Sequence, residues 1–189
     1  LFRSMAFGLS GIANTFSIIF WGDQFALSGT VIMYLAITIP FTAFANVIRT
    51  QYLIPKGLDK VYLKSVVFGA VINLIINYSL IPSYGAIGAA IGTICAEISV
   101  CVIQVFAIRN EIPIKTYIKK ALPFFVPGIT MFISVFEIGR LMGVHIYTLF
   151  VQLLVGSFTY LLVTGLYFYK TGKFKTILSM VKSHAKHKK

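Results

Sequence analysis

Two ionisable residues stand inside otherwise apolar runs of this sequence, and their side chains are the best suited to chemistry. Arg49 lies about five residues, roughly 7 Å of helical rise, inside the end of its run, which Pro55 and Lys56 mark. Its guanidinium can hold an anion such as a phosphate through two hydrogen bonds, or it can reach outward to lipid phosphates. Glu97 lies deep in its run, where a carboxyl group must be paired or protonated. This position suits a counter-ion, a protonation switch or a bond between helices.

Polar side chains recur at helical spacing around these two residues. Thr42 and Asn46 precede Arg49 with intervals of four and three residues, which places all three on one helical face. Such faces either bond neighbouring helices or line an internal space, where amides can bind sugar hydroxyls. The residues that we expect to line such a space are Arg49, Asn46, Thr42, Asn73, Asn77, Glu97, Gln104 and Asn14.

The runs that carry these residues are too apolar for a soluble domain. Of the 189 residues, 58% are hydrophobic and only 12% are charged, and the mean hydropathy is +0.87. A soluble domain of this length could not keep so much apolar surface away from water. The formal net charge of +12 does not indicate nucleic-acid binding, because the Lys and Arg residues stand between apolar runs and in the C-terminal tail. The sequence therefore predicts an all-α integral membrane protein.

Six apolar runs are each long enough to cross a bilayer as a helix. They cover residues 2–20, 28–54, 60–81, 85–108, 118–141 and 146–169. Pro40 is expected to kink the second run, and Pro123 and Pro127 are expected to bend the fifth. Lys and Arg concentrate in alternate links and in the tail. The positive-inside rule therefore places both ends of this segment in the cytoplasm.

The two ends of the chain carry further signals. The tail at 170–189 has Phe174, Ile177 and Val181 at helical spacing among lysines, which predicts a basic amphipathic helix on an anionic inner leaflet. At the other end the chain begins with Leu1, and the first apolar run follows without a basic leader or a cleavage site. We therefore expect no signal peptide and the C-terminal part of a longer protein.

Motifs for catalysis or cofactor binding are not found in the sequence. It contains no GxxxxGK[ST] loop, no HExxH and no GxSxG, and the glycine-rich GAIGAAIG stretch lies on a membrane-spanning run. The links are also too short to hold an enzymatic site. We therefore predict no enzyme, no metal and no cofactor, and leave a coupling ion open.

Three stretches carry a resemblance to a known family. They read WGDQF, NVIRTQYLIPKGLDKVY and INLIINYSLIPSYGAIGAAIGTICAE. These stretches resemble the C-terminal half of Wzx-type polysaccharide flippases, which belong to the multidrug/oligosaccharidyl-lipid/polysaccharide exporter superfamily. The resemblance covers residues 1–108, whereas the last two helices match only in number and position.

This resemblance implies a two-bundle exporter of 12 to 14 helices that works by alternating access around a cationic cavity. Residues 1–108 would be helices of the C-terminal bundle, 109–169 two additional helices and 170–189 a cytoplasmic tail. The implied substrate is an undecaprenyl-pyrophosphate-linked oligosaccharide for capsule, O-antigen or another surface polymer, moved across the bacterial cytoplasmic membrane. The implied partners are membrane lipids, the missing N-terminal bundle of the same chain and the polysaccharide polymerase machinery.

Other functions remain open on the sequence alone. An ion-coupled multidrug antiporter of the same superfamily would need a carboxylate-lined cation site, for which Glu97 is a single candidate. A membrane-embedded polysaccharide polymerase or glycosyltransferase would need a long outer loop or an acidic loop motif, and this segment has neither. In a purely structural membrane subunit, Arg49 and Glu97 would serve assembly alone.

Overall fold

The architecture is known from a computed structural model that describes residues 2–171, apart from the side chains of Arg3, Lys115 and Ile118. All regular elements of the described part are helices, and six of them are long and apolar enough to span a membrane. The predicted all-α membrane fold with six spans is therefore confirmed. The amphipathic helix predicted in the tail lies outside the described residues.

The six spans are built from eight α-helices and three short turns of other helical types. The α-helices are α1 (Phe2–Trp21), α2 (Ala26–Ala36), α3 (Thr38–Ile48), α4 (Asp59–Tyr84), α5 (Ala86–Ile108), α6 (Ile114–Ala121), α7 (Phe125–Met142) and α8 (Ile146–Lys170). The turns are 3₁₀ at Asp23–Phe25, π at Arg49–Leu53 and 3₁₀ at Leu122–Phe124.

Prolines account for the breaks inside two of the spans. The second span is interrupted at Ile37, between α2 and α3, because Pro40 has no N–H to donate to the carbonyl of Ala36 and its ring crowds that carbonyl. The fifth span is divided at the 3₁₀ turn that contains Pro123. Both bends lie where the sequence predicts them.

The tightest helix pair in the molecule is the α4–α5 hairpin. It turns at Gly85, whose φ of 53° is a backbone conformation that side-chain-bearing residues rarely adopt. Just past the turn, a Cβ on Gly88 would lie 2.6 Å from the carbonyl oxygen of Leu80. Because glycine has no side chain, the two backbones can approach this closely.

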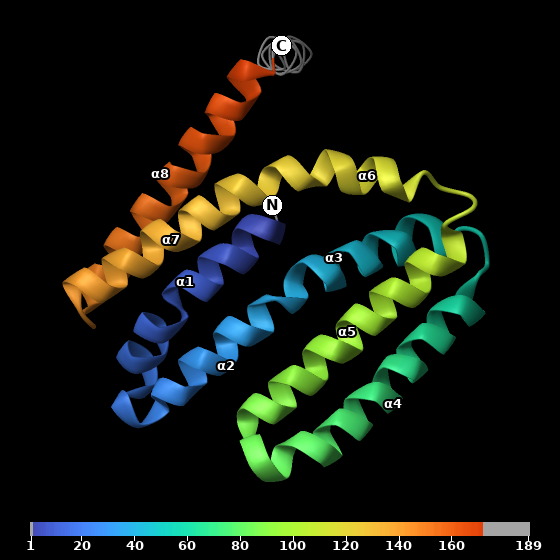
Figure 1. Cartoon of the computed structure of the whole chain (residues 1–189), viewed down its shortest axis with the longest axis horizontal. Coiled ribbons are helices and arrows are strands. Elements are labelled where there is room, and N and C mark those ends of the chain that lie inside the picture. Colours follow the sequence, from blue (N-terminus) through green and yellow to red (C-terminus); the bar gives the residue numbers. More distant parts are fainter. Residues whose placement is uncertain (1, 172–189) are drawn as a thin grey trace, which may run out of the picture.

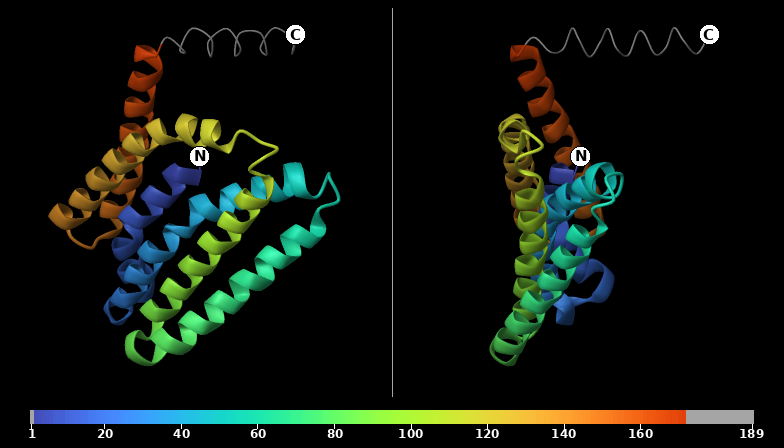
Figure 2. Two further views of the ribbon diagram at one scale, coloured as in Figure 1. Left: turned by 45° about the vertical axis from the view of Figure 1, so that its right-hand side comes forward. Right: turned by 90° about the vertical axis from the view of Figure 1, so that its right-hand side faces the viewer.

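The helices form an elongated bundle in which the two basic links, after α3 and after α5, lie at the same end. Figure 1 shows that the link after α3 and the link after α5 lie side by side, with the N-terminus and the end of α8 on the same side of the molecule. The other views show the same arrangement (Figure 2). The links at the opposite end join α1 to α2, α4 to α5 and α7 to α8.

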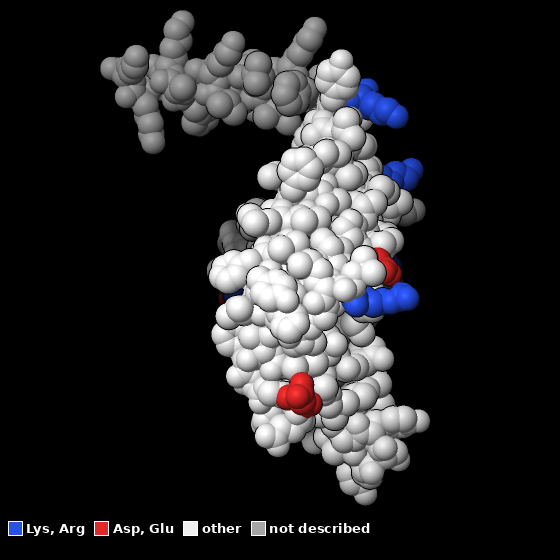
Figure 3. Space-filling view, turned by 90° about the vertical axis from the view of Figure 1, so that its left-hand side faces the viewer, with Lys and Arg blue, Asp and Glu red and all other residues white. Residues whose placement is uncertain are grey.

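The outer surface is apolar over most of its area. The face seen in Figure 3 is almost free of Lys, Arg, Asp and Glu. Large apolar side chains such as Leu74, Leu154 and Leu161 are more than two-thirds exposed. A surface of this kind is stable in the hydrocarbon core of a bilayer, so the chain is a multi-pass membrane protein.

Candidate functional site

Arg49 opens the π turn at the end of α3. The wider turn is marked by the bond from the Ile54 N–H to the Arg49 carbonyl at 3.0 Å, five residues back instead of four. One terminal nitrogen of the guanidinium donates to the Tyr62 hydroxyl at 3.1 Å, and the group lies 5.2 Å from the centre of the Tyr62 ring. The buried Nε–H of Arg49 has no hydrogen-bond partner in the described part of the chain. Arg49 therefore keeps donor capacity for an anion.

Thr42 and Glu97 meet between α3 and α5. The Thr42 hydroxyl lies 2.9 Å from Oε2 of Glu97 and 3.1 Å from the carbonyl oxygen of Thr38. If Glu97 is protonated, it donates to Thr42, which in turn donates to the Thr38 carbonyl. If Glu97 is ionised, Thr42 donates to the carboxylate. Either protonation state is thus paired inside the membrane span, as expected for a carboxyl group at this depth.

Asn73 and Asn77 face the partner helix α5 within the α4–α5 hairpin. The Asn77 amide donates to Oδ1 of Asn73 at 2.9 Å, and the Asn73 amide reaches the Thr93 hydroxyl at 3.5 Å. Oδ1 of Asn77 lies only 2.2 Å from where a Cβ on Gly92 would be, which suits a weak Cα–H···O contact. The contact between Asn73 and Thr93 crosses from α4 to α5, whereas the bond between Asn77 and Asn73 lies within α4.

Gln104 forms a second polar contact along the same helix pair. Its amide donates to the Ser65 hydroxyl at 3.0 Å, and both residues are almost fully buried. By contrast, Asn14 on α1 and Asn46 on α3 are exposed on the surface of the described chain. The structure therefore brings Thr42 together with Glu97 and Asn73 together with Asn77, but the eight predicted residues do not form one cluster.

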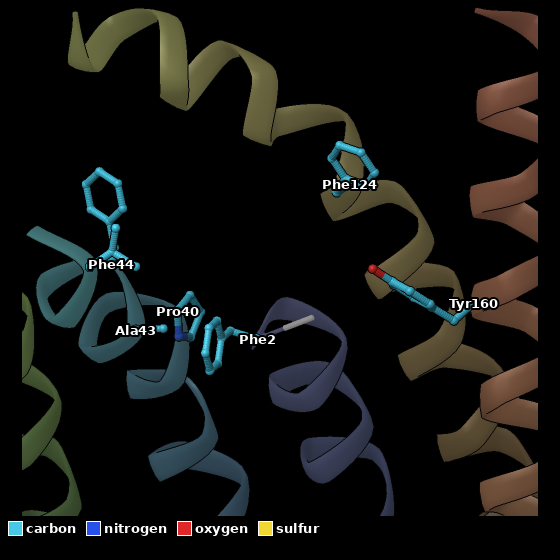
Figure 4. Close-up of a pocket in the computed structure, with 7 residues that line it drawn as sticks. Phe2, Pro40, Ala43, Phe44, Phe124 and Tyr160 are labelled. Atoms are coloured by element: carbon cyan, nitrogen blue, oxygen red, sulfur yellow. The ribbon is translucent and has the colours of Figure 1, made fainter. Parts of the chain in front are cut away.

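A cavity of about 340 Å³ lies between α1, α3, α8 and the turn before α7. Its lining residues are Phe2, Pro40, Ala43, Phe44, Val47, Phe124 and Tyr160, and Figure 4 shows their positions. The α3 members lie on a different face of that helix from Thr42 and Arg49, because they follow a separate helical stripe. None of the eight predicted residues lines this largely aromatic cavity.

An ion-pair cluster joins the link after α3 to the link after α5, and the sequence does not predict it. The ammonium group of Lys56 lies 2.5 Å from the Glu111 carboxylate, and the Tyr52 hydroxyl bonds to both side chains. The bond to Lys56 holds the pKa of the exposed Glu111 carboxyl below its usual range, and the bond to Glu111 raises the pKa of Lys56. The sequence separation of 55 residues explains why no local pattern predicts this contact.

Metal ligands do not gather in the described part of the chain. No group of three or more His, Cys, Asp or Glu side chains there is arranged to hold a metal ion. The polar contacts described above are hydroxyl, amide, carboxyl and guanidinium groups within or at the ends of membrane spans. Such groups can bind hydrogen-bonding and anionic ligands.

Comparison with known proteins places the chain near two membrane proteins. It is 26% identical over 103 residues to a Shigella dysenteriae protein described as "Putative O-antigen transporter", a match that covers 54% of this chain and 26% of that protein. It is 36% identical over 74 residues to an uncharacterized membrane protein of Methanocaldococcus jannaschii, covering 39% of this chain and 18% of that protein. The matches thus span about a quarter or less of these relatives' lengths. No family model and no solved structure matches the chain.

Proposed function

We propose that this chain is part of an exporter that flips undecaprenyl-pyrophosphate-linked oligosaccharides across the bacterial cytoplasmic membrane, for the synthesis of capsule, O-antigen or another surface polymer. The observation that carries the proposal is Arg49, a cation within a membrane span whose guanidinium retains a buried N–H without a partner. The similarity to the Shigella protein described as an O-antigen transporter supports the same class of substrate.

The chemistry of the substrate matches the groups that the spans carry. A pyrophosphate that leaves water needs cationic donors to offset its desolvation, and a guanidinium can bind its oxygens bidentately. The sugars present hydroxyl groups, which amides such as those of Asn46 and Asn14 can bind from the exposed side of the described chain. The polyprenyl chain is apolar and would stay in the lipid throughout the step.

In this proposal the described helices work together with a further bundle of the same protein. The head group would enter from the cytoplasm, bind between the two bundles and leave on the other side when the bundles rock. The basic links and both ends of this segment would face the cytoplasm, on the side opposite to the polysaccharide polymerase machinery. That machinery would take the flipped unit on the outer side.

The test is made in the full-length protein by replacing Arg49 with Ala and, separately, with Lys. The proposal expects Arg49→Ala to lose surface polysaccharide and to accumulate lipid-linked units on the inner leaflet, at unchanged protein levels in the membrane. Arg49→Lys keeps the charge but not the bidentate geometry, and should retain part of the export. Normal export by Arg49→Ala would leave Arg49 as a side chain that reaches lipid phosphates.

The contact between Thr42 and Glu97 favours a second candidate, an ion-coupled antiporter. A carboxyl group within a span that is paired in either protonation state can carry a proton across a conformational change. In that case Glu97→Gln would abolish the dependence of transport on the ion gradient, and multidrug substrates would compete. If export does not depend on proton or sodium gradients in the wild type, this candidate is excluded.

A further inference from the structure

Helix α6 separates apolar from basic residues around its axis. At about 100° per residue, Ile114, Tyr117 and Ala121 lie on one side of the helix. Thr116, Lys119 and Lys120 lie on the opposite side. Ile114 is buried in an apolar cluster with Ile48, Leu53 and Ile108, so one end of the apolar side is anchored to the protein.

Tyr117, on the same side of α6, remains largely exposed. It is 53% exposed, and just beyond the helix Leu122 and Val126 are 62% and 59% exposed. Exposed apolar and aromatic side chains at the end of a span suit contact with lipid, so Tyr117 can enter the acyl region while Ile114 packs against the protein.

The length of the fifth span determines the depth of Lys119 and Lys120 in the membrane. From Leu122 to Met142 the chain covers about 30 Å at about 1.5 Å per residue, which is the thickness of the hydrocarbon core. Lys119 and Lys120 lie three and two residues before Leu122, which places them near the level of the lipid phosphates. Figure 2 shows α6 bending away from the line of α7 and lying across that end of the bundle.

The charge around α6 is positive and not compensated. Lys119 and Lys120 are exposed and form no ion pair within the described part of the chain. Arg109, at the start of the same link, stacks on the Phe106 ring with its guanidinium 3.6 Å from the ring centre. The acid of this link, Glu111, is already paired with Lys56. An anion that pairs with these two lysines would therefore come from outside the described part of the chain.

We propose that α6 is an interfacial helix that binds the phosphate groups of anionic phospholipids, such as phosphatidylglycerol, in the leaflet at this end of the molecule. Its two exposed lysines bind the phosphates while Tyr117 enters the acyl region, so the lipid fixes the direction in which the chain enters α7. The proposal depends on the placement of the spans in a membrane and not on the transported substrate.

The test compares phosphatidylglycerol with phosphatidylcholine on the purified full-length protein. Lipid retention is measured by native mass spectrometry from mixed micelles. The wild type should retain phosphatidylglycerol preferentially, and Lys119→Gln/Lys120→Gln should lower that preference by about fivefold per lysine, which corresponds to about 1 kcal/mol for each basic residue near an anionic surface. Lys119→Arg/Lys120→Arg keeps both charges and should retain the preference.

A composition-matched variant separates the helix pattern from net charge. Tyr117→Lys/Lys119→Tyr exchanges two residues of α6 that lie about 160° apart around the helix axis at about 100° per residue, so the charge of the protein is unchanged while the basic and apolar sides are mixed. The proposal expects this variant, with its helix content confirmed by circular dichroism, to lose most of the preference. Full preference in this variant or in Lys119→Gln/Lys120→Gln would overturn the proposal. So would displacement of phosphatidylglycerol by inorganic phosphate at an ionic strength matched with sodium chloride.

Discussion

The carboxyl group of Glu97 shows how single residues make polar chemistry tolerable inside a membrane span. It is bonded to Thr42, whose hydroxyl also lies within bonding distance of the backbone carbonyl of Thr38, so Glu97 keeps a hydrogen-bond partner whether it is protonated or ionised. From the sequence, the depth of Glu97 predicts that it must be paired or protonated. The identity of its partner is not predictable, because Thr42 lies 55 residues away on another helix.

A double-mutant cycle on Thr42→Val and Glu97→Leu measures this contact, because neither replacement side chain can form the hydrogen bond. We expect a coupling free energy of about 0.6 kcal/mol and at most about 1.7 kcal/mol, the range for hydrogen bonds between helices in membranes. The measurement is reversible unfolding in detergent. A control cycle on Thr42 and Gln104 should be additive within about 0.5 kcal/mol, because Gln104 bonds to Ser65 instead. No coupling in the first cycle would contradict the observed contact.

The amides illustrate the alternatives that residue patterns leave open. Asn73 and Asn77 were equally suited to a helix contact and to sugar binding on sequence alone, and in this conformation they bond within the α4–α5 hairpin. Asn14 and Asn46 had the same pattern but are exposed. Side-chain type and spacing predict that a face is polar, whereas the neighbour that meets it depends on how the helices pack.

At the scale of the helix, some breaks follow from residue type and others do not. Pro40 and Pro123 predict the bends in the second and fifth spans because proline removes a backbone donor. The π turn that begins at Arg49 has no such residue. It is held by packing, since Leu53 within the turn is fully buried against Ile48 and Ile108. The same turn at Pro123 separates α6 from α7, although the sequence predicts one span from residue 118.

Glycine substitutions test the close approach of α4 and α5. Gly88→Ala should destabilise the protein by about 1 to 3 kcal/mol, because the added methyl group would meet the backbone of Leu80 and backbone atoms cannot move aside. The matched control is Gly165→Ala in α8, where the site is open and the change should be neutral or stabilising. Thermal unfolding in detergent measures both variants. Equal stability of Gly88→Ala and the wild type would show that the hairpin is looser than described.

The pairing of Lys56 with Glu111 predicts a dependence on pH. The lowered pKa of Glu111 means that the contact is present above the usual carboxyl range and is lost as the pH falls through the lowered value. The raised pKa of Lys56 means that the contact is lost only as the pH rises through a value above the usual lysine range. Hydrogen exchange of the segments around the two residues, corrected for intrinsic rates, should therefore show loss of protection in acid.

The control for that experiment is Glu111→Gln, which removes the charge. In this variant the protection of the two links should no longer change in the acid range. Both side chains are exposed, so the global unfolding temperature should change little. If the variant and the wild type lose protection with the same pH profile, a different group controls the contact between the links.

For the whole molecule, the distribution of charge between the two ends supports one orientation. The basic links after α3 and α5 lie together at one end, whereas the link after α1 carries Asp23 and the link after α4 has no charged residue. The alternation of charge along the sequence predicts this segregation correctly. The number and order of the spans are predictable for the same reason: length and hydropathy are properties of each segment alone.

Cysteine labelling of intact cells tests the orientation. In a background without Cys95 and Cys101, a cysteine at Asp23 or Gly143 should react with a membrane-impermeant maleimide from outside. A cysteine at Lys56 or Lys119 should react only after the cells are permeabilised. The reverse pattern would show that the basic links face outward, and would contradict the proposed entry of substrate from the cytoplasmic side.

In the proposed function, substrate and mechanism belong to an assembly that is larger than the described helices. The matched segments cover only 26% and 18% of the two relatives, and the cavity between α1, α3 and α8 is lined by none of the predicted polar residues. A substrate site between two bundles would need residues from both. The spans are therefore predictable from this sequence alone, whereas the composition of such a site stays a prediction.

The most direct test of the proposed function is a flipping measurement with the purified full-length protein in liposomes. The substrate is a fluorescent oligosaccharide linked to a polyprenyl pyrophosphate, and a membrane-impermeant quencher reports the fraction exposed outside. We expect the wild type to exchange the lipid between leaflets much faster than protein-free liposomes. Arg49→Ala should slow the exchange by about 10-fold to 100-fold, the equivalent of a lost charge-assisted hydrogen bond. Exchange no faster than in protein-free liposomes, with folded wild-type protein, would contradict the proposed function.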